Sequence, residues 1–149
     1  MTACPPSWGK ARSVFAFDLA TGRLKWSYDT PGPIDANAAE YDGTLYIGAG
    51  DSKLYALDAA TGKPRWTFQT GKGGVYSSPV VVNGVVYVGS NDHRLYALDS
   101  ATGRRKWAFT TGGDIYASSP VVTSGLVIVG SQDGNLYAVD STTGAGPAR

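Results

Sequence analysis

The chain has 149 residues, 42% of them hydrophobic, which is enough apolar surface for one ordinary domain with a buried core. Thirteen Lys and Arg residues stand against twelve Asp and Glu residues, and the net charge of +1 gives no general field for a phosphate backbone, so nucleic acid is not an expected partner. The apolar runs are far shorter than the roughly 20 residues that cross a bilayer, so no membrane span is expected, and the single cysteine, Cys4, excludes an internal disulfide and a thiolate metal cluster.

The chain begins with residues 1–12, which we predict to be irregular. This segment contains consecutive prolines and lacks the apolar stretch of a secretion signal. The sequence therefore leaves the location unknown: the protein is either cytoplasmic or has lost a leader. We interpret Cys4 as a passive surface cysteine rather than the remnant of a lipid-attachment site, because no apolar segment precedes it.

An internal repeat organises residues 13–144. The pattern Asp-x-x-Thr-Gly-x-x-x-Trp occurs three times and begins a fourth time, and its Asp residues follow at intervals of 40, 41 and 41 positions. This period suits one four-stranded propeller blade and is too long for a leucine-rich or ankyrin unit. We predict a partial repeat over residues 13–30, full repeats over 34–70 and 75–111, a partial repeat over 115–144 and a tail over 145–149.

Each full repeat has the pattern of four antiparallel strands. In the second full repeat the predicted strands are residues 78–82, 85–89, 94–98 and 105–109, and the Asn83-Gly84 turn suits a type I′ hairpin. The two middle strands are apolar on both faces, as a sheet packed between neighbouring sheets requires. With two strands at the start and three at the end, the chain has thirteen strands. This count predicts an all-β fold of about three β-propeller blades, in which the first and last blades are incomplete.

The repeated block itself indicates a structural role. An Asp carboxylate can accept the N–H groups of the residues that follow it, and a Gly with positive φ closes such a turn. Each Trp is followed two positions later by another aromatic residue on the same face of the outer strand, so we expect it to fill the gap between adjacent blades. The residues assigned to this structural motif are Asp18, Gly22, Trp26, Asp58, Gly62, Trp66, Asp99, Gly103 and Trp107.

The segment from Ala56 to Trp66 resembles the tryptophan-docking motif of the pyrroloquinoline-quinone (PQQ) type β-propeller repeat. Residues 16–26 and 97–107 carry the same pattern, and the turns around Asp92 and Asp133 resemble the rest of that repeat. The resemblance covers roughly residues 13–144. The family includes quinoprotein dehydrogenases, whose propeller holds PQQ and calcium, and proteins without a cofactor, namely an outer-membrane assembly lipoprotein and extracytoplasmic sensor domains of bacterial kinases.

Two functions are implied by this resemblance. We expect a noncatalytic module that acts as a scaffold for a protein or a small polar ligand, with no cofactor, no catalytic residue and no metal site. The alternative is a fragment of a PQQ-dependent alcohol or sugar dehydrogenase, which would bring PQQ and calcium. The sequence lacks the adjacent cysteine pair that packs on the quinone in those enzymes, which favours the first function. The resemblance also suggests a periplasmic or extracellular location.

The resemblance places the ligand face at the linkers that join one blade's outer strand to the next blade's inner strand. These linkers, residues 31–37, 71–78 and 112–119, supply hydroxyls, an amide and two carboxylates that suit a polar ligand or a peptide. The alternative is that their Ser-Pro pairs only open the next strand. The candidate ligand or partner residues are Asp35, Asn37, Tyr76, Ser77, Ser78, Asp114, Tyr116, Ser118 and Ser119.

Other polar residues are expected to be structural. His93 is the only histidine, and one imidazole without a neighbouring Asp and Ser forms neither a catalytic triad nor a zinc site, so an exposed turn residue is favoured. Asp51, Asp92 and Asp133 recur in the same turn as its hydrogen-bonding residues. Basic residues at the start of the outer strands either dock an acidic partner or protect an exposed edge from aggregation. They are Arg23, Lys25, Lys63, Arg65, Arg104, Arg105 and Lys106.

Both ends of the repeat array stop in mid-blade. By the repeat offset, a strand missing from the first repeat falls on residues 5–8, where prolines deny a ladder its donors, and Ala148 stands where the last repeat's Trp is due. Propellers close with four to eight blades. The alternatives are a part of a longer propeller, a homo-oligomer that completes the ring by sharing strands, or an open arc with capped edges. In the homo-oligomer, residues 24–28 would pair with the last sheet of a neighbour.

Overall fold

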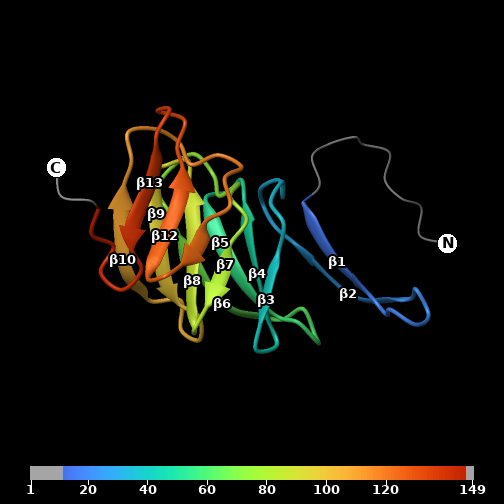
Figure 1. The fold of residues 1–149 in the computed structure, drawn as a ribbon. Coiled ribbons are helices and arrows are strands. Elements are labelled where there is room, and N and C mark those ends of the chain that lie inside the picture. The colour runs from blue at the N-terminus through green and yellow to red at the C-terminus, as the bar shows by residue number, and fades with distance from the viewer. Residues whose placement is uncertain (1–11, 147–149) are drawn as a thin grey trace.

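The protein is described here by a computed structural model that covers residues 12–146. Its strands form four antiparallel sheets, which follow one another in chain order from the hairpin at one end to the orange and red strands at the other (Figure 1). We number the sheets as blades 1 to 4. Blade 1 is β1 (Ser13–Phe17) and β2 (Leu24–Asp29); blade 2 is β3 (Ala39–Tyr41), β4 (Thr44–Ala49), β5 (Lys53–Asp58) and β6 (Pro64–Gln69); blade 3 is β7 (Val80–Val82), β8 (Val85–Ser90), β9 (Arg94–Asp99) and β10 (Arg105–Thr110); blade 4 is β11 (Val121–Thr123), β12 (Leu126–Gly130) and β13 (Leu136–Asp140).

This architecture confirms the predicted all-β propeller fold. The described residues hold thirteen strands, two full four-stranded blades and two incomplete ones, as the repeat count predicts. Within residues 12–146 no helix is long and apolar enough to span a membrane. Residues 5–8, where the repeat offset places the strand expected to be missing from the first repeat, and Ala148 lie outside the described residues.

The hairpin turns have the predicted conformation. Both central residues have positive φ in each turn, with 50° and 75° at Asn83 and Gly84 of blade 3, which is the type I′ geometry. The inner strand of that blade is shorter than predicted, because β7 begins at Val80 rather than at residue 78. Pro79 has no N–H to donate to a ladder, and the preceding serine belongs to the linker.

The core lies between the blades rather than within one of them. The middle strands bury both faces, so Tyr55 and Leu57 contact blade 1 while Leu54 and Ala56, one residue away, contact blade 3. A third cluster joins blades 3 and 4 around Leu95. Each fully buried Leu contributes about 1.5–3 kcal/mol relative to exposure, so the stability of each blade depends on the presence of its neighbours.

Candidate functional site

The blades have two ends of different construction. At one end, which we call the turn face, each hairpin turn bonds to the Asp-Thr-Gly turn of its own blade: the N–H of Ser100 donates to the carbonyl of Gly84 at 2.9 Å, with equivalent bonds in blades 2 and 4. At the other end, the linker face, the linkers between blades meet the turns between the two middle strands. There the N–H of Asn91 donates to the carbonyl of Gly74 at 3.1 Å. All nine candidate ligand residues are on the linkers and thus belong to the linker face.

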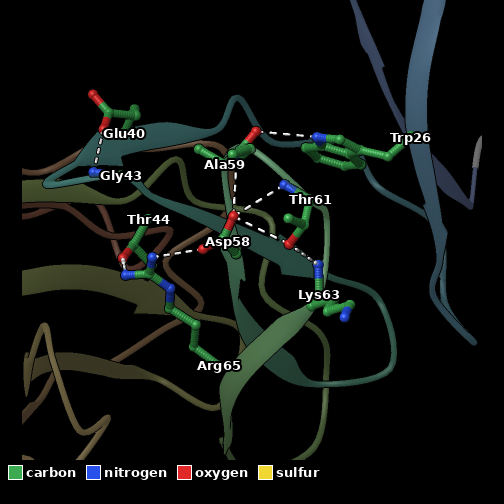
Figure 2. Close-up of polar contacts among 10 residues, drawn as sticks. Trp26, Glu40, Gly43, Thr44, Asp58, Ala59, Thr61, Lys63 and Arg65 are labelled. Carbon is green, nitrogen blue, oxygen red and sulfur yellow. Dashed lines mark hydrogen bonds and ion pairs between the residues drawn. The ribbon is translucent and has the colours of Figure 1, made fainter.

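On the turn face, the repeated Asp organises a closed turn. Oδ1 of Asp58 accepts the N–H groups of Ala60 and Thr61, both at 2.9 Å, and the hydroxyl of Thr61 at 3.1 Å (Figure 2). Gly62 then takes a φ of 74°, where a side chain would be strained. The same bonds recur at Asp18, Asp99 and Asp140. The Asp carboxylate is therefore committed to its own turn.

Blade 2 adds an ion pair to this turn. The guanidinium of Arg65 contacts Oδ2 of Asp58 at 2.7 Å and donates to the hydroxyl of Thr44 at 2.6 Å (Figure 2). The Arg65 hydrogen bond and the turn amide of Thr61 hold the pKa of Asp58 at about 2, below its usual value of 3.8. Arg65, one of the basic residues at the start of the outer strands, thus forms its ion pair within its own blade.

Each tryptophan of the repeat contacts the following blade. The indole N–H of Trp26 donates to the carbonyl of Ala59 at 3.0 Å (Figure 2), and its ring covers Gly62, where an added methyl carbon would lie 2.5 Å from the indole. Trp66 and Trp107 repeat this arrangement on blades 3 and 4, with N–H to carbonyl distances of 3.0 Å. Trp107 is 8% exposed, whereas Trp26 and Trp66 are only partly buried. The expectation of burial between blades thus agrees with Trp107 and overstates the burial of Trp66, because the outer strand lies at the periphery.

On the linker face, two of the candidate serines form hydrogen bonds with the backbone of the blades and linkers. The hydroxyl of Ser77, which is fully buried, donates to the carbonyl of Ser118 at 2.6 Å and accepts the N–H of Gly89 at 3.2 Å. The hydroxyl of Ser118 accepts the N–H of Gly130 at 3.1 Å. These bonds tie consecutive linkers together and leave little hydrogen-bonding capacity for a ligand.

A third serine links the first two linkers in the same way. The hydroxyl of Ser78 accepts the N–H of Asn37 at 2.9 Å. The Asn37 side chain is exposed, as are Asp35 and Ser119, and within residues 12–146 the side chains of these three residues form no hydrogen bond with the other candidates. These three residues offer a carboxylate, an amide and a hydroxyl to solvent.

An aromatic pair lies on this face. The rings of Tyr76 and Tyr116 have centroids 5.4 Å apart at an interplanar angle of 57°. Tyr76 is packed over Gly50, where an added methyl carbon would lie 2.6 Å from its hydroxyl oxygen. Tyr116 precedes Ala117, whose φ of 51° is in the left-handed region, and Tyr116 is 46% exposed. The pair thus has one fixed ring and one ring that presents apolar surface and a hydroxyl to solvent.

The same linker takes part in a contact that the sequence interpretation missed. Nε2 of His93 is 2.9 Å from Oδ1 of Asp114, and both side chains are partly exposed. His93 is an exposed turn residue, as the sequence interpretation favoured, but that interpretation did not identify Asp114 as its partner. The N–H of Gly71 donates to Asp92 and that of Gly112 to Asp133, and in both pairs the residues are 21 positions apart, as His93 and Asp114 are. This recurring separation could have predicted the contact of His93.

The recurring Asp of the middle turn has structural partners. Oδ2 of Asp92 accepts the hydroxyl of Tyr96 at 2.5 Å and the N–H of Gly71 at 2.6 Å, so it fastens the incoming linker to its blade. Asp133 accepts Tyr137 in the same manner, and Asp51 accepts Tyr55. Burial and the adjacent Asp51 carboxylate both raise the pKa of Tyr55 far above its usual value. These carboxylates belong to the scaffold.

The comparisons with known proteins agree with this fold. The family model described as outer membrane protein assembly factor BamB matches residues 10–146. The crystal structure of BamB from Moraxella catarrhalis is 27% identical with a TM-score of 0.77, over 91% of this chain and 45% of that one. No curated protein matches the sequence.

Quinoprotein enzymes share the architecture too. The quinohemoprotein alcohol dehydrogenase ADHIIG from Pseudomonas putida HK5 is 28% identical with a TM-score of 0.64, over 80% of this chain and 20% of that enzyme. The quinohemoprotein alcohol dehydrogenase from Comamonas testosteroni, at 24% identity and a TM-score of 0.77 over 91% of this chain and 31% of that one, shows the fold alone. The chain thus spans less than half the length of each of these proteins. Because the family model covers nearly all of the sequence, the chain belongs to the BamB family of PQQ-type β-propeller repeat proteins.

Proposed function

We propose that this chain is a noncatalytic PQQ-like propeller module, a scaffold that binds a protein or a small polar ligand at its linker face. The observation that carries the proposal is the exposed ring of Tyr116, which packs against Tyr76 and follows Asp114, the partner of His93, by two residues on the same linker. Binding energy at protein interfaces concentrates on aromatic residues held in place by their neighbours, since little side-chain entropy is then lost on binding.

The surroundings of this ring favour a peptide or protein over an apolar small molecule. Asp35, Asn37 and Ser119 are exposed on the same face and can exchange hydrogen bonds with a partner's backbone. The likeness to BamB, which is named as an outer membrane protein assembly factor, supports an assembly partner and an extracytoplasmic location as parts of the same proposal.

The likeness to ADHIIG supports the second candidate, a portion of a PQQ-dependent dehydrogenase. We tested whether this chain's residues fit PQQ and calcium. The sequence has one cysteine, so no adjacent pair can pack on a quinone. On the linker face, Asp51, Asp92 and Asp133 are bonded to tyrosine hydroxyls and Asp114 to His93. Within residues 12–146 no three His, Cys, Asp or Glu side chains gather as metal ligands. The described residues therefore do not fit the cofactor.

Site-specific photo-crosslinking tests the proposal. A photoreactive phenylalanine analogue placed at Tyr116 should form one discrete protein adduct in cells, and Tyr76→Ala or Asp114→Asn should weaken it. The same analogue at Thr123, which is exposed on the turn face, is the control and should give none. Equal adducts at both positions would contradict a specific linker face. A calorimetric titration with PQQ and Ca²⁺ provides the second arm: stoichiometric binding would favour the dehydrogenase.

A further inference from the structure

The turn face has a cavity of about 450 Å³ between blades 3 and 4. Its apolar wall is formed by three half-buried valines, Val82, Val85 and Val122, and by Tyr87, whose hydroxyl donates to the carbonyl of Ser141 at 3.2 Å. The volume lies within the range of about 300–1,000 Å³ that is usual for small-molecule sites. The cavity is therefore large enough for a small ligand, and two consecutive blades frame it.

The corresponding cavity between blades 2 and 3 is much smaller. Its volume is about 130 Å³, and Arg65 lines it. The guanidinium of Arg65 is held on its own blade by Oδ2 of Asp58 at 2.7 Å and by the hydroxyl of Thr44 at 2.6 Å (Figure 2). In blade 3 the repeat has Lys106 at the position of Arg65 and Val85 at that of Thr44, so the guanidinium and its hydroxyl partner are both replaced. We attribute the larger cavity to these two replacements.

Lys106 brings a positive charge to the larger cavity. Of the described residues that line the cavity, Lys106 alone is charged, and it takes part in no ion pair within residues 12–146. The carboxylates of Asp99 and Asp140, which begin the turns of blades 3 and 4, do not line the cavity and accept N–H groups of their own turns. An ammonium group beside an apolar wall, without an acidic partner among the described residues, favours an anionic ligand.

Uncharged polar side chains also line the cavity. Among residues 12–146 none of these side chains forms a hydrogen bond, whereas the hydroxyl of Thr44 in blade 2 is bonded to Arg65. Hydroxyl and amide groups can each donate to a carboxylate oxygen. A single ammonium group also matches the one charge of a carboxylate better than the charge of about −2 on a phosphate group. The polar side chains are those of Asn83, Thr123, Ser124, Ser141 and Thr142.

We propose that this cavity binds a small carboxylate with an apolar body. The body, an aromatic ring or a branched chain, packs against Val82, Val85 and Val122, and the carboxylate accepts hydrogen bonds from the ammonium group of Lys106 and from the hydroxyls beside it. The site is on the turn face, so it is independent of the partner proposed for the linker face. Because the ligand is not a protein, the crosslinking control at Thr123 is expected to give no protein adduct in either case.

An NMR titration of the isotope-labelled chain with 3-phenylpropionate tests the site. The backbone amides of Val85, Gly125 and Thr142, which line the cavity, should shift and reach saturation with a dissociation constant of about 1 mM or below. The amide of Tyr116 on the linker face should not shift. The compound 3-phenylpropionamide, which has the same body without the charge, should bind about tenfold more weakly. Inorganic phosphate, which has no apolar body, should also bind more weakly than the acid.

Two variants and a matched control make the result specific. Lys106→Ala should weaken the binding of 3-phenylpropionate about tenfold. The double variant Val85→Thr with Lys106→Arg introduces the residues of blade 2 and should close the cavity, so that binding is lost without a fall in the urea midpoint. Lys25→Ala removes an exposed lysine at the same repeat position of blade 1 and should leave binding unchanged. If the double variant fails to fold, Lys106→Ala decides.

Three outcomes would overturn the proposal. One is the absence of saturable shifts at the amides that line the cavity. Another is equal binding of the acid and its amide, or of the acid and phosphate, because the site would then recognise only one half of the ligand. A third is binding that Lys106→Ala does not weaken, since the ammonium group would then take no part.

Discussion

The contact between Trp66 and blade 3 makes a quantitative prediction about stability. Trp66 packs on Tyr46 with ring centroids 5.7 Å apart, covers Gly103 and donates its N–H to the carbonyl of Ser100 at 3.0 Å. Trp66→Ala removes all three interactions at once. Because the blades are held together by such contacts, the loss should appear in the free energy of unfolding.

The expected magnitude follows from the burial of the indole. Replacing a buried tryptophan by alanine costs about 3–5 kcal/mol, and the partial exposure of Trp66 places it near the lower value, at about 3 kcal/mol. The hydrogen bond is a minor part, because the Ser100 carbonyl keeps the hydroxyl of Tyr46 at 2.9 Å. Trp66→Phe, which loses only the N–H and some area, should therefore cost about 1 kcal/mol.

Urea unfolding and thermal melting measure both variants. For a chain of this size about 3 kcal/mol corresponds to a fall in melting temperature of about 6–12 °C. Thr67→Ala, at an exposed position on the same strand, is the matched control and should change stability by less than about 0.5 kcal/mol. If Trp66→Ala unfolds at the same urea concentration as the parent, the indole does not hold the blades together and the reasoning is refuted.

Further predictions concern the turns, the charges and the assembly. Gly103→Ala should destabilise more than Gly125→Ala, because both have positive φ but only the first has an indole 2.6 Å from the added carbon; urea midpoints that coincide would contradict this. The pKa of Asp58 is lowered from 3.8 to about 2, so its carboxylate stabilises the fold above about pH 4 and this contribution is lost as the pH falls through about 2. Asp58→Asn should therefore flatten the fall in melting temperature over that range, and an unchanged profile would contradict the assignment. Strand sharing between copies, in which residues 24–28 pair with a neighbour's last sheet, predicts a mass that rises with concentration, and light scattering that finds only monomers of the unmodified chain excludes it.

The sequence predicted the architecture because every local signal recurs at one period. Asp, Thr-Gly and Trp fix the ends of the outer strands, and the Asn83-Gly84 type of turn fixes the register of the inner pair. Apolar residues on both faces of the middle strands require neighbouring sheets. The repeat period therefore predicts how the sheets pack against one another, which the pattern of a single strand would not predict.

The linker face was harder to predict because its contacts join residues of different blades. The hydroxyl of Ser77 bonds to a carbonyl 41 residues away, and His93 meets Asp114 across a linker. The third linker is also one residue shorter than the second before its buried aliphatic residue, Ile115 against Val75, and the left-handed Ala117 then restores the repeat period at Ser118. The left-handed conformation of Ala117 has no propensity signal in the sequence, since alanine rarely adopts positive φ.

Glycines of the middle strands contact one buried aliphatic residue in each of the second and third linkers, while an exposed residue follows it in the third linker. A methyl carbon on Gly48 would lie 2.5 Å from Val75, and one on Gly89 would lie 2.1 Å from Ile115, so each strand leaves room for one aliphatic linker residue. That residue anchors the linker and is fully buried in both cases. The neighbouring position holds tyrosine in both linkers, but Tyr76 is packed over Gly50 whereas Tyr116 is 46% exposed. The exposed positions of this face can therefore change without disturbing the buried aliphatic contact, which would let one repeat scaffold present different side chains to the partner proposed above.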